Sequence, residues 1–240
     1  MPRFFTEHGD ENEIILTGED ARHIGFSLRM RPGESLTVCA EGIDYECEIT
    51  RITGDAVYLH PVHIAPCAAE PSVAVTLYMA VPKQDKLAEI VQKCTELGVT
   101  RIVPVLTARC VARPTKADFG KKQERLQKIA CAAAKQSGRG IIPEVTELVT
   151  WKEALRQMQE EDISVMLYEE QGGVRFGAVP LEGCRNIGLF IGSEGGIGED
   201  EAEQAIRAGI HRVWLGRRIL RCETAPTAAL SILMYLTDNL

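Results

Sequence analysis

The chain has 240 residues, of which 45% are hydrophobic, and its formal net charge at pH 7 is −7. This length suggests one or two domains, and so apolar a composition excludes a disordered chain. No apolar run approaches the roughly 18 residues of a membrane span, and the N-terminus lacks a basic segment followed by an apolar one. We therefore expect a globular, cytoplasmic protein with no membrane partner.

From the N-terminus to about residue 70, short alternating segments predict a small β-rich domain. Strands are expected at 35–40, 44–53 and 56–63, because turn signals separate these segments. A helix-like stretch at 18–28 interrupts the pattern and exposes basic side chains in an acidic region. Pro61, Pro66 and Pro71 then mark a probable linker, so the first domain is predicted at 1–70.

Beyond Pro71 the chain changes to strands that alternate with helices. This alternation predicts a second domain at 71–240, an α/β unit with a mostly parallel sheet covered by helices. Strands are expected at 73–80, 102–106, 163–168, 187–191 and 212–215, and helices at 83–97, 119–136, 151–158, 199–208 and 224–236.

Charge is distributed unevenly along the chain. Residues 1–70 carry five basic and thirteen acidic side chains (−8), and residues 141–210 carry five and fourteen (−9). Residues 101–140 carry ten basic and two acidic side chains, a balance of +8. Such a block is the footprint expected of phosphate contacts, although a solvated helix face also collects lysines, so both interpretations stay open.

A glycine-rich loop follows the predicted strand at 187–191 and reads Gly-Ser-Glu-Gly-Gly-Ile-Gly from Gly192 to Gly198. The P-loop is excluded because no Gly-Lys-Ser/Thr follows, and the dinucleotide fingerprint fits badly because Glu201 stands where a third Gly or Ala belongs. Glu194 lies within the loop and four acidic residues follow at 199–203. These acids favour a cationic or neutral ligand, although those at 199–203 equally suit a helix N-terminus.

A second loop of this kind, Leu215 to Ala225, follows the strand predicted at 212–215. Ligands of open α/β sheets bind at the carboxyl ends of strands, so both loops and the Leu167-Tyr168-Glu169 turn can converge on one pocket. Arg221 and Glu223 bring opposite charges to its mouth. Alternatively, Thr224 caps the last helix and Arg221 simply pairs with Glu223.

The eight cysteines are scattered without a Cys-x-x-Cys pair. We expect reduced, mostly structural thiols and no metal site. Cys222 lies between Arg221 and Glu223, and for this thiol alone a nucleophilic role stays open.

The two loops resemble the two signature segments of the ribosomal RNA small subunit methyltransferase E family, which belongs to the SPOUT class of knotted RNA methyltransferases. Further landmarks of that family are matched by Arg3-Phe4-Phe5, His23-Ile24 with Leu28-Arg29, Gln92-Lys93 with Glu96-Leu97-Gly98, and Gln136-Ser137-Gly138-Arg139 with Pro143. The sequence departs from the family at Ser193, where proline is usual, and at Lys135, where acidic residues are common.

The resemblance implies a PUA-like β-barrel at 1–70 that binds RNA and a SPOUT methyltransferase domain at 71–240 with a C-terminal trefoil knot. It also implies S-adenosylmethionine as cofactor, a homodimer, and methylation of N3 of a uridine in small-subunit (16S) ribosomal RNA. The substrate is either the free RNA or the assembled 30S subunit.

The resemblance and the loops together indicate three groups of site residues. Arg221 and Glu223 are the expected catalytic residues. The cofactor is expected at Leu167, Tyr168, Ile191, Gly192, Glu194, Gly195, Gly196, Leu215, Gly216, Ile219, Leu220, Thr224 and Ala225. RNA is expected at Arg3, Arg22, His23, Arg29, Arg31, Lys93, Arg109, Lys135, Gln136 and Arg139.

Three alternative functions stay open. An RNA ribose 2′-O-methyltransferase of the same fold would share the donor loops, and only its product would differ. A non-catalytic RNA-binding assembly factor would keep the fold without binding the donor. A nucleotide-dependent oxidoreductase is disfavoured by the missing third Gly or Ala.

Overall fold

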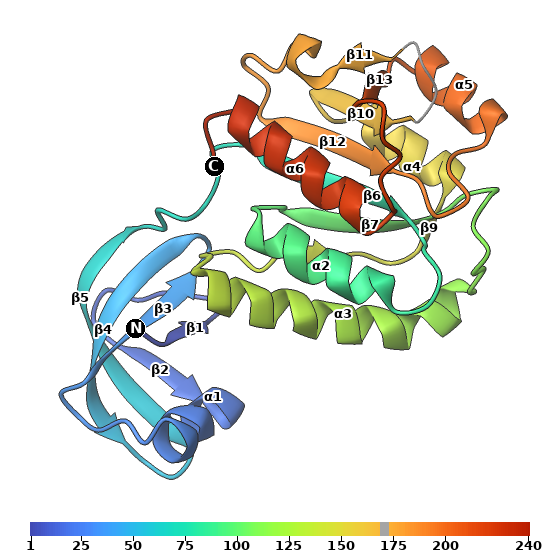
Figure 1. Cartoon of the computed structure of the whole chain (residues 1–240). Coiled ribbons are helices and arrows are strands. Elements are labelled where there is room, and N and C mark those ends of the chain that lie inside the picture. The colour runs from blue at the N-terminus through green and yellow to red at the C-terminus, as the bar shows by residue number, and fades with distance from the viewer. Residues whose placement is uncertain (169–172) are drawn as a thin grey trace. The chain divides into compact units, whose positions relative to one another are not determined.

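The computed structural model describes residues 1–168 and 173–240, which form two compact units (Figure 1). Unit 1 comprises residues 1–70 and 134–141, and unit 2 comprises residues 71–133 and 142–240. Each unit has its own hydrophobic core.

Unit 1 is built on a five-stranded sheet with the order β1-β3-β4-β5-β2. The strands are β1 (Arg3–Phe5), β2 (Ile14–Thr17), β3 (Ser35–Ala40), β4 (Ile43–Ile52) and β5 (Ala56–Pro66), and only the β1/β3 pair is parallel. The sheet curls, and among the described residues its edge strands β1 and β2 do not pair with each other, so the predicted barrel is a partly open one (Figure 1). The helix α1 (Gly18–Arg22) and the π-helical turn η1 (His23–Ser27) form the interruption that the sequence predicts.

The predicted linker is wrong at Pro61 and Pro66, because β5 continues through both residues. The antiparallel partner β2 covers β5 only as far as Leu59, so the later part of β5 pairs on one side alone. Proline is tolerated there because its missing N–H is not needed on an unpaired edge. The register also shifts here: the consecutive residues Glu46 and Cys47 pair with His63 and Pro61, so β5 carries an extra residue, Val62, beside Pro61.

Unit 2 contains a parallel sheet with the order β11-β13-β10-β12-β6-β7-β8, and β9 also pairs with β7. The strands are β6 (Ala74–Ala80), β7 (Arg101–Leu106), β8 (Glu144–Val145), β9 (Val149–Thr150), β10 (Ile163–Leu167), β11 (Val174–Arg175), β12 (Asn186–Ile191) and β13 (His211–Trp214). The two-residue strands β8, β9 and β11 were not predicted, since they are too short to produce a periodic pattern.

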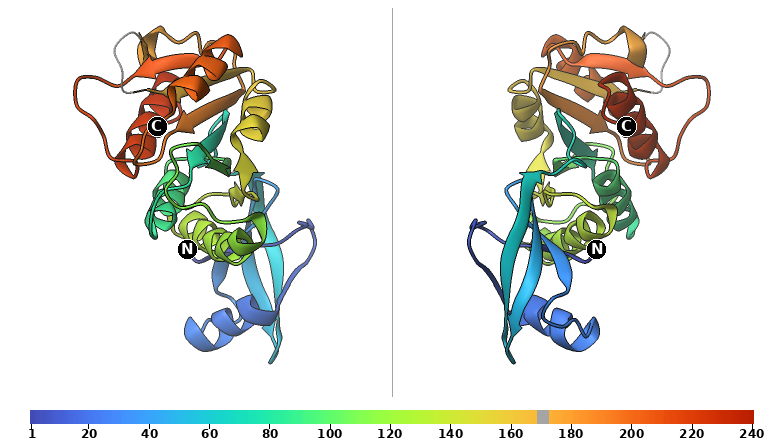
Figure 2. Two further views of the ribbon diagram at one scale, coloured as in Figure 1. Left: turned by 90° about the vertical axis from the view of Figure 1, so that its right-hand side faces the viewer. Right: turned by 90° about the vertical axis from the view of Figure 1, so that its left-hand side faces the viewer.

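Helices cover both faces of this sheet. They are α2 (Lys86–Glu96), α3 (Lys116–Ser137), α4 (Trp151–Met158), α5 (Glu199–Arg207) and α6 (Thr224–Leu236), with a short 3-10 turn η2 (Phe176–Ala178). Helices α2 and α6 lie on one face and α4 on the other (Figures 1 and 2). Helix α2 buries its apolar stripe and ends at Glu96, and Gly98 follows with a φ of +95°, which suits the left-handed position after a helix. No helix of the described residues is long and apolar enough to cross a bilayer.

The order of the strands positions the site. Strands β13, β10 and β12 are neighbours and parallel, so their carboxyl ends meet at one edge of the sheet. Strand β6 pairs with β12 on its other side, which brings the β6–α2 connection to the same edge. The trefoil knot remains an expectation from the resemblance.

Candidate functional site

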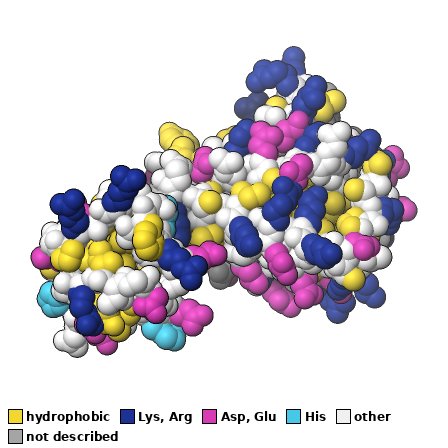
Figure 3. All heavy atoms as spheres, turned by 90° about the horizontal axis from the view of Figure 1, so that it is seen from below, with side chains coloured by type: hydrophobic (Ala, Val, Ile, Leu, Met, Phe, Trp, Pro, Cys, Tyr) yellow, Lys and Arg dark blue, Asp and Glu magenta, His cyan; other side chains and the backbone are white. Residues whose placement is uncertain are grey.

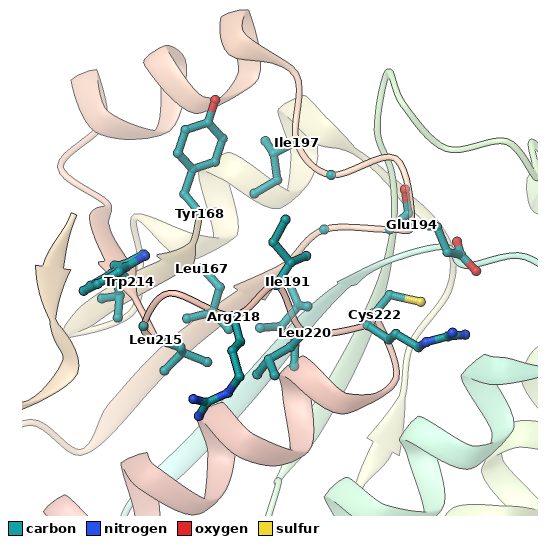
Figure 4. A pocket seen from close by; sticks show the side chains of 18 of the residues that line it. Leu167, Tyr168, Ile191, Glu194, Ile197, Trp214, Leu215, Arg218, Leu220 and Cys222 are labelled. Atoms are coloured by element: carbon teal, nitrogen blue, oxygen red, sulfur yellow. The ribbon is translucent and has the colours of Figure 1, made fainter. Parts of the chain in front are cut away.

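One cavity of about 620 Å³ lies at this edge of the parallel sheet in unit 2 (Figure 4). Its walls come from the ends of β10, β12 and β13 and from the two loops that the sequence singles out. The structure therefore brings the 192–198 loop, the 215–225 loop and Leu167-Tyr168 together as predicted. Glu169, the third residue of that turn, lies outside the described residues.

Most of the residues predicted to bind a cofactor line this cavity. They are Leu167, Tyr168, Ile191, Gly192, Glu194, Gly196, Leu215, Gly216, Ile219, Leu220 and Ala225, and Arg221 lines it as well. Gly195, Glu223 and Thr224 are not among the lining residues. The lining also includes residues that were not predicted to bind the cofactor, namely Lys86, Ser193, Ile197, Val213, Trp214, Arg217, Arg218 and Cys222.

The cavity has an apolar floor. Figure 4 shows Leu167, Ile191 and Leu220 close together at its centre, and Leu215 and Trp214 lie beside them. Its volume falls within the range of roughly 300–1,000 Å³ that is typical of sites for small molecules and cofactors. A flat aromatic heterocycle suits such a floor, because burying apolar surface on both sides of the ring is favourable.

The 192–198 loop is a tight turn that leaves no room for a side chain at Gly192 or Gly195. The Gly196 N–H donates to the Ser193 carbonyl over 2.9 Å, and Gly196 has a φ of +69°. A Cβ on Gly192 would lie 3.0 Å from Ile197 Cγ1, and one on Gly195 would lie 2.7 Å from the Arg109 carbonyl oxygen. These glycines let the backbone fold closely on itself at the edge of the cavity.

The acidic run after the loop is structural and lies away from the cavity. Glu201 is buried; its carboxylate accepts from the Gly198 N–H over 3.2 Å and from the Ala108 N–H over 2.8 Å. It therefore caps the start of α5, the simpler of the two interpretations left open by the sequence. Among the described residues Glu194 is the acid that lines the cavity, and Glu199, Asp200, Glu201 and Glu203 are not among its lining residues.

Three arginines bring positive charge to the lining of the cavity. Arg217, Arg218 and Arg221 line it, and all three side chains are exposed. A cavity that combines apolar side chains with exposed guanidinium groups can hold a small ligand next to a polyanion, since Arg binds phosphate and stacks on bases.

Lys86 joins the two loops of the site. Its Nζ lies 3.1 Å from Glu194 Oε1 and 3.1 Å from Glu223 Oε2, and it donates to Cys222 Sγ over 3.8 Å. The Lys83 backbone N–H also donates to both carboxylate oxygens of Glu194, each over 3.2 Å. The start of α2 is thus tied to both loops.

The surroundings of Glu223 differ from those expected. Hydrogen bonds from the Cys222 thiol, from its own backbone N–H and from Lys86 lower the pKa of Glu223 to about 2. Burial and the bond to Glu223 raise the pKa of Cys222 to about 12, so this thiol is a poor nucleophile. Among the described residues Glu223 pairs with Lys86 and not with Arg221, so the alternative of an Arg221–Glu223 pair is not seen.

Glu194 is held as a carboxylate. Its partial burial alone would raise its pKa, but hydrogen bonds from its own N–H, from Lys86 and from Lys83 N–H outweigh this effect and lower it. The side chains of Lys86, Glu194 and Glu223 together carry a net charge of −1, because one ammonium group faces two carboxylates.

A signal in the sequence could have indicated Lys86. The first turn of a helix favours anions, since the backbone N–H groups there carry partial positive charge. A lysine at the first residue of α2, shortly after the buried strand β6 ends at Ala80, is locally unfavourable and so suggests a negatively charged partner.

Of the residues predicted to bind RNA, Lys93 and Arg109 lie in unit 2, and the others fall into two groups in unit 1. Arg22, His23, Arg29 and Arg31 are exposed on the segment 22–31, and so is Gln136 on α3. That segment also exposes 72% of Phe26, an aromatic side chain that the sequence analysis missed. An exposed ring among cations is a platform on which an unpaired base can stack.

The second group serves the fold of unit 1. Arg139 is 2% exposed, and it pairs with Glu70 through Nη2–Oε2 (2.8 Å) and Nε–Oε1 (2.9 Å), so RNA cannot reach it in this structure. Arg3 pairs with Asp44 at 2.7 Å, and Lys135 pairs with Asp20 at 3.0 Å.

The basic block at 101–140 is mixed with acidic side chains on the surface of unit 2 that carries α3 (Figure 3). Arg125 pairs with Asp85, and Lys116 pairs with Glu153 at 3.3 Å. Lys93, on α2, pairs with Glu89 at 2.6 Å, whereas Arg109 is exposed and donates to the Gly195 carbonyl over 3.4 Å. The block is therefore less available to phosphates than its net charge of +8 suggests.

No group of three or more His, Cys, Asp or Glu side chains in the described part of the chain is arranged to hold a metal ion. All eight cysteines are free thiols.

Comparison with known proteins places this site in a family. Residues 69–234 match a model described as an RNA methyltransferase domain, and residues 16–62 match one described as an RNA methyltransferase PUA domain. The chain is 36% identical to ribosomal RNA small subunit methyltransferase E of Bacillus subtilis, covering 100% of this chain and 98% of the relative. It is 30% identical to the protein of the same name in Aquifex aeolicus, covering 98% and 99%.

A solved structure is also similar over nearly the whole length. It is a ribosomal RNA small subunit methyltransferase E from Neisseria gonorrhoeae bound to S-adenosyl methionine. The TM-score is 0.88, the sequence identity is 31%, and the alignment covers 98% of each chain.

Proposed function

The chain belongs to the ribosomal RNA small subunit methyltransferase E family, and from this premise we propose that it transfers a methyl group from S-adenosylmethionine to N3 of a uridine in small-subunit ribosomal RNA. The observation that carries the proposal is the cavity at the ends of β10, β12 and β13, whose lining combines apolar side chains with three exposed arginines.

The cavity suits the methyl donor in size and chemistry. Leu167, Ile191 and Leu220 offer apolar surface to an adenine ring, and the backbone at Gly192 and Gly216 is open to hydrogen bonds with the nucleoside. Bound S-adenosylmethionine supplies an electrophilic methyl group on a positively charged sulfur. The net charge of −1 on Lys86, Glu194 and Glu223 favours a cation nearby, because opposite charges attract more strongly where water is partly excluded.

Methylation of N3 requires that nitrogen to lose its proton and to face the methyl group in line. Negative charge then develops on the base and is shared with the neighbouring carbonyl oxygens. Arg221 lines the cavity with an exposed side chain, so we assign to it the stabilisation of this charge. Positioning of the two reactants supplies much of the remaining acceleration.

Glu223 is better suited to hold the loop than to accept the N3 proton. Its pKa of about 2 makes it a weak base, and its carboxylate is engaged by Lys86 and Cys222. We therefore assign Glu223 to the shape of the loop, and the proton leaves to water or to a group of the RNA.

RNA contacts are proposed at the segment 22–31 of unit 1 and at the arginines of the cavity. The cations at 22, 29 and 31 hold phosphates, and Arg217 and Arg218 hold the RNA around the target base. The base must leave any stack for N3 to reach the cavity.

Product analysis tests the proposed reaction. Purified protein is incubated with S-adenosylmethionine and either free small-subunit RNA or assembled 30S subunits, and the RNA is digested for mass mapping. We expect one N3-methyluridine in one of the two substrates. A ribose-methylated nucleotide would instead establish the 2′-O-methyltransferase.

A non-catalytic assembly factor is the alternative from another class. It predicts RNA binding with no heat of S-adenosylmethionine binding in calorimetry, so a measured donor affinity in the micromolar range would exclude it.

We also propose a homodimer. Helix α6 exposes Tyr235 and partly exposes Ile232 and Leu236, an apolar surface on the unit that carries the cavity. Light scattering on the purified protein should give twice the chain mass of 26.4 kDa, and a monomer at working concentrations would contradict this.

A further inference from the structure

Lys86, the first residue of α2, contacts both loops of the cavity. The 192–198 loop follows β12 and the 215–223 loop follows β13, and β10 separates these two strands in the sheet. The two loops contribute one carboxylate each, Glu194 and Glu223, and both lie 3.1 Å from Lys86 Nζ.

The carboxylates would repel one another without this ammonium group. Because Glu194 Oε1 and Glu223 Oε2 each lie 3.1 Å from the same nitrogen, they are at most 6.2 Å apart. The three side chains are between 20% and 26% exposed, so water screens the repulsion only in part.

The backbone strengthens the same connection. The Lys83 N–H donates to both carboxylate oxygens of Glu194. Glu194 is therefore bound by two residues, Lys83 in the β6–α2 connection and Lys86 at the start of α2. The lysine also opposes the local preference of a helix N-terminus for anions, and the two carboxylates compensate for this.

We propose that Lys86 is a positioning residue, which acts by fixing the distance between the two loops through Glu194 and Glu223 and so shapes the cavity before a ligand enters. The inference rests on the proposed function only for its ligand, S-adenosylmethionine. Its structural part, that the ammonium group orders both loops, holds for the unliganded protein.

The first experiment measures loop order without any ligand. Hydrogen exchange is compared in the wild type, Lys86→Met and Lys86→Arg. We expect amides of both loops, 192–198 and 215–223, to exchange at least tenfold faster in Lys86→Met, with β6 and β12 unchanged as evidence of an intact fold. Lys86→Arg should restore protection, because it keeps the charge. Unchanged loop exchange in Lys86→Met would overturn the proposal.

The second experiment measures the donor affinity by calorimetry. Lys86→Met should weaken S-adenosylmethionine binding at least tenfold, and Lys86→Arg should stay within threefold of the wild type. Lys116→Met is the matched control, since it removes a lysine that pairs with Glu153 at an exposed site, and it should bind the donor like the wild type.

A double background separates positioning from direct contact. In Glu194→Gln/Glu223→Gln the carboxylates no longer repel, so adding Lys86→Met should change the donor affinity by less than threefold. A full tenfold loss in that background would mean that Lys86 touches the ligand itself and would overturn the positioning role. Absence of donor binding by the wild type would instead refute the proposed function, and the exchange result would still decide the role of Lys86.

Discussion

Arg221 and Glu223 are two residues apart, yet the fold gives them different surroundings. Glu223 is engaged by Lys86 and Cys222, whereas the Arg221 side chain is exposed in the lining of the cavity. No carboxylate among the described residues forms an ion pair with Arg221. The arginine is therefore available to an incoming ligand, and the glutamate is not.

Replacing Arg221 by alanine should separate chemistry from donor binding. We expect the turnover number to fall by about 10²–10³, the usual effect of removing one group that stabilises developing negative charge. The donor affinity should change only a few-fold, because the backbone of the loop stays in place. Single-turnover methylation and calorimetry on the same preparation measure the two effects, and wild-type turnover would contradict the assignment.

The ionisation of Glu223 should not control the rate around neutral pH. Its folded-state pKa of about 2 lies below the ordinary value of 4.5, so the ionised group stabilises the folded loop. This contribution is complete above pH 4.5 and is lost as the pH falls towards 2.

We therefore expect Glu223→Gln to keep every inflection of the neutral-range rate profile, with a lower rate throughout. The measurement is the turnover number as a function of pH for both proteins. Loss of one limb of the profile in Glu223→Gln would identify Glu223 as the general base after all.

Ser193 shows how a departure from the family is accommodated. The sequence has serine where proline is usual, but the turn is closed by the Gly196 N–H to Ser193 C=O bond, and the Ser193 side chain is buried. Serine thus keeps the bond that defines the turn.

At the scale of elements, the site depends on how closely loops can approach one another. Gly195 lies against the backbone of Arg109 in the connection after β7, so the 192–198 loop is supported from both β6 and β7. Closely packed backbone leaves little freedom to relax around an added methyl group.

Gly195→Ala should distort the loop. Its Cβ would lie 2.7 Å from the Arg109 carbonyl oxygen, a backbone atom that cannot rotate away. We expect a loss of about 1–3 kcal/mol in the free energy of unfolding and about tenfold weaker donor binding. Urea unfolding and calorimetry measure the two quantities.

Gly120→Ala is the matched control for this substitution. Gly120 lies within α3 and nothing stands within 4 Å of its Cβ position, so alanine should stabilise the helix by about 0.5–1 kcal/mol and leave the donor affinity unchanged. Equal losses of stability and donor affinity in both variants would show that the 192–198 loop tolerates an added methyl group no worse than α3 does.

Strand β5 shows that a proline in the sequence does not by itself exclude a strand. Pro61 and Pro66 suggested a linker, but proline excludes a strand only where its N–H would be needed. Whether the N–H is needed depends on which strand lies alongside, and that neighbour, β2, is about forty residues earlier in the chain.

In the whole molecule, the two units differ in the distribution of their charged side chains, and the cavity lies in unit 2. Unit 1 is acidic along its sequence but exposes Arg22, Arg29 and Arg31 together on the segment 22–31. We propose this small cationic segment as the RNA contact region of the otherwise acidic unit.

Arg29→Ala/Arg31→Ala should weaken RNA binding in a salt-dependent manner. Each phosphate contact on a single strand contributes about 0.7 to the slope of log K against log salt, so the double variant should lower the slope by about 1.4. Titrations of labelled RNA at several salt concentrations measure it. Arg51→Ala is the control, because that guanidinium lies 3.7 Å from the centroid of the Tyr58 ring; an equal change in the control would exclude a specific role for the segment.

The class of the fold and the two loops that line the cavity could be predicted from the sequence, whereas the assignment of residues 134–141 to unit 1 could not. Periodic apolar positions predict strands and helices, and parallel strands must end at a common edge, so the convergence of the loops follows from local patterns. The motifs of the loops then indicated the family.

The partners of the charged residues are visible only in the folded chain. Arg139 is buried against Glu70, and Glu201 caps the start of α5. Three arginines line the cavity, and Lys86 lies between Glu194 and Glu223. The physical reason is distance along the chain. Lys86 and Cys222 are 136 residues apart, and a pairing over such a separation leaves no periodic pattern in the sequence.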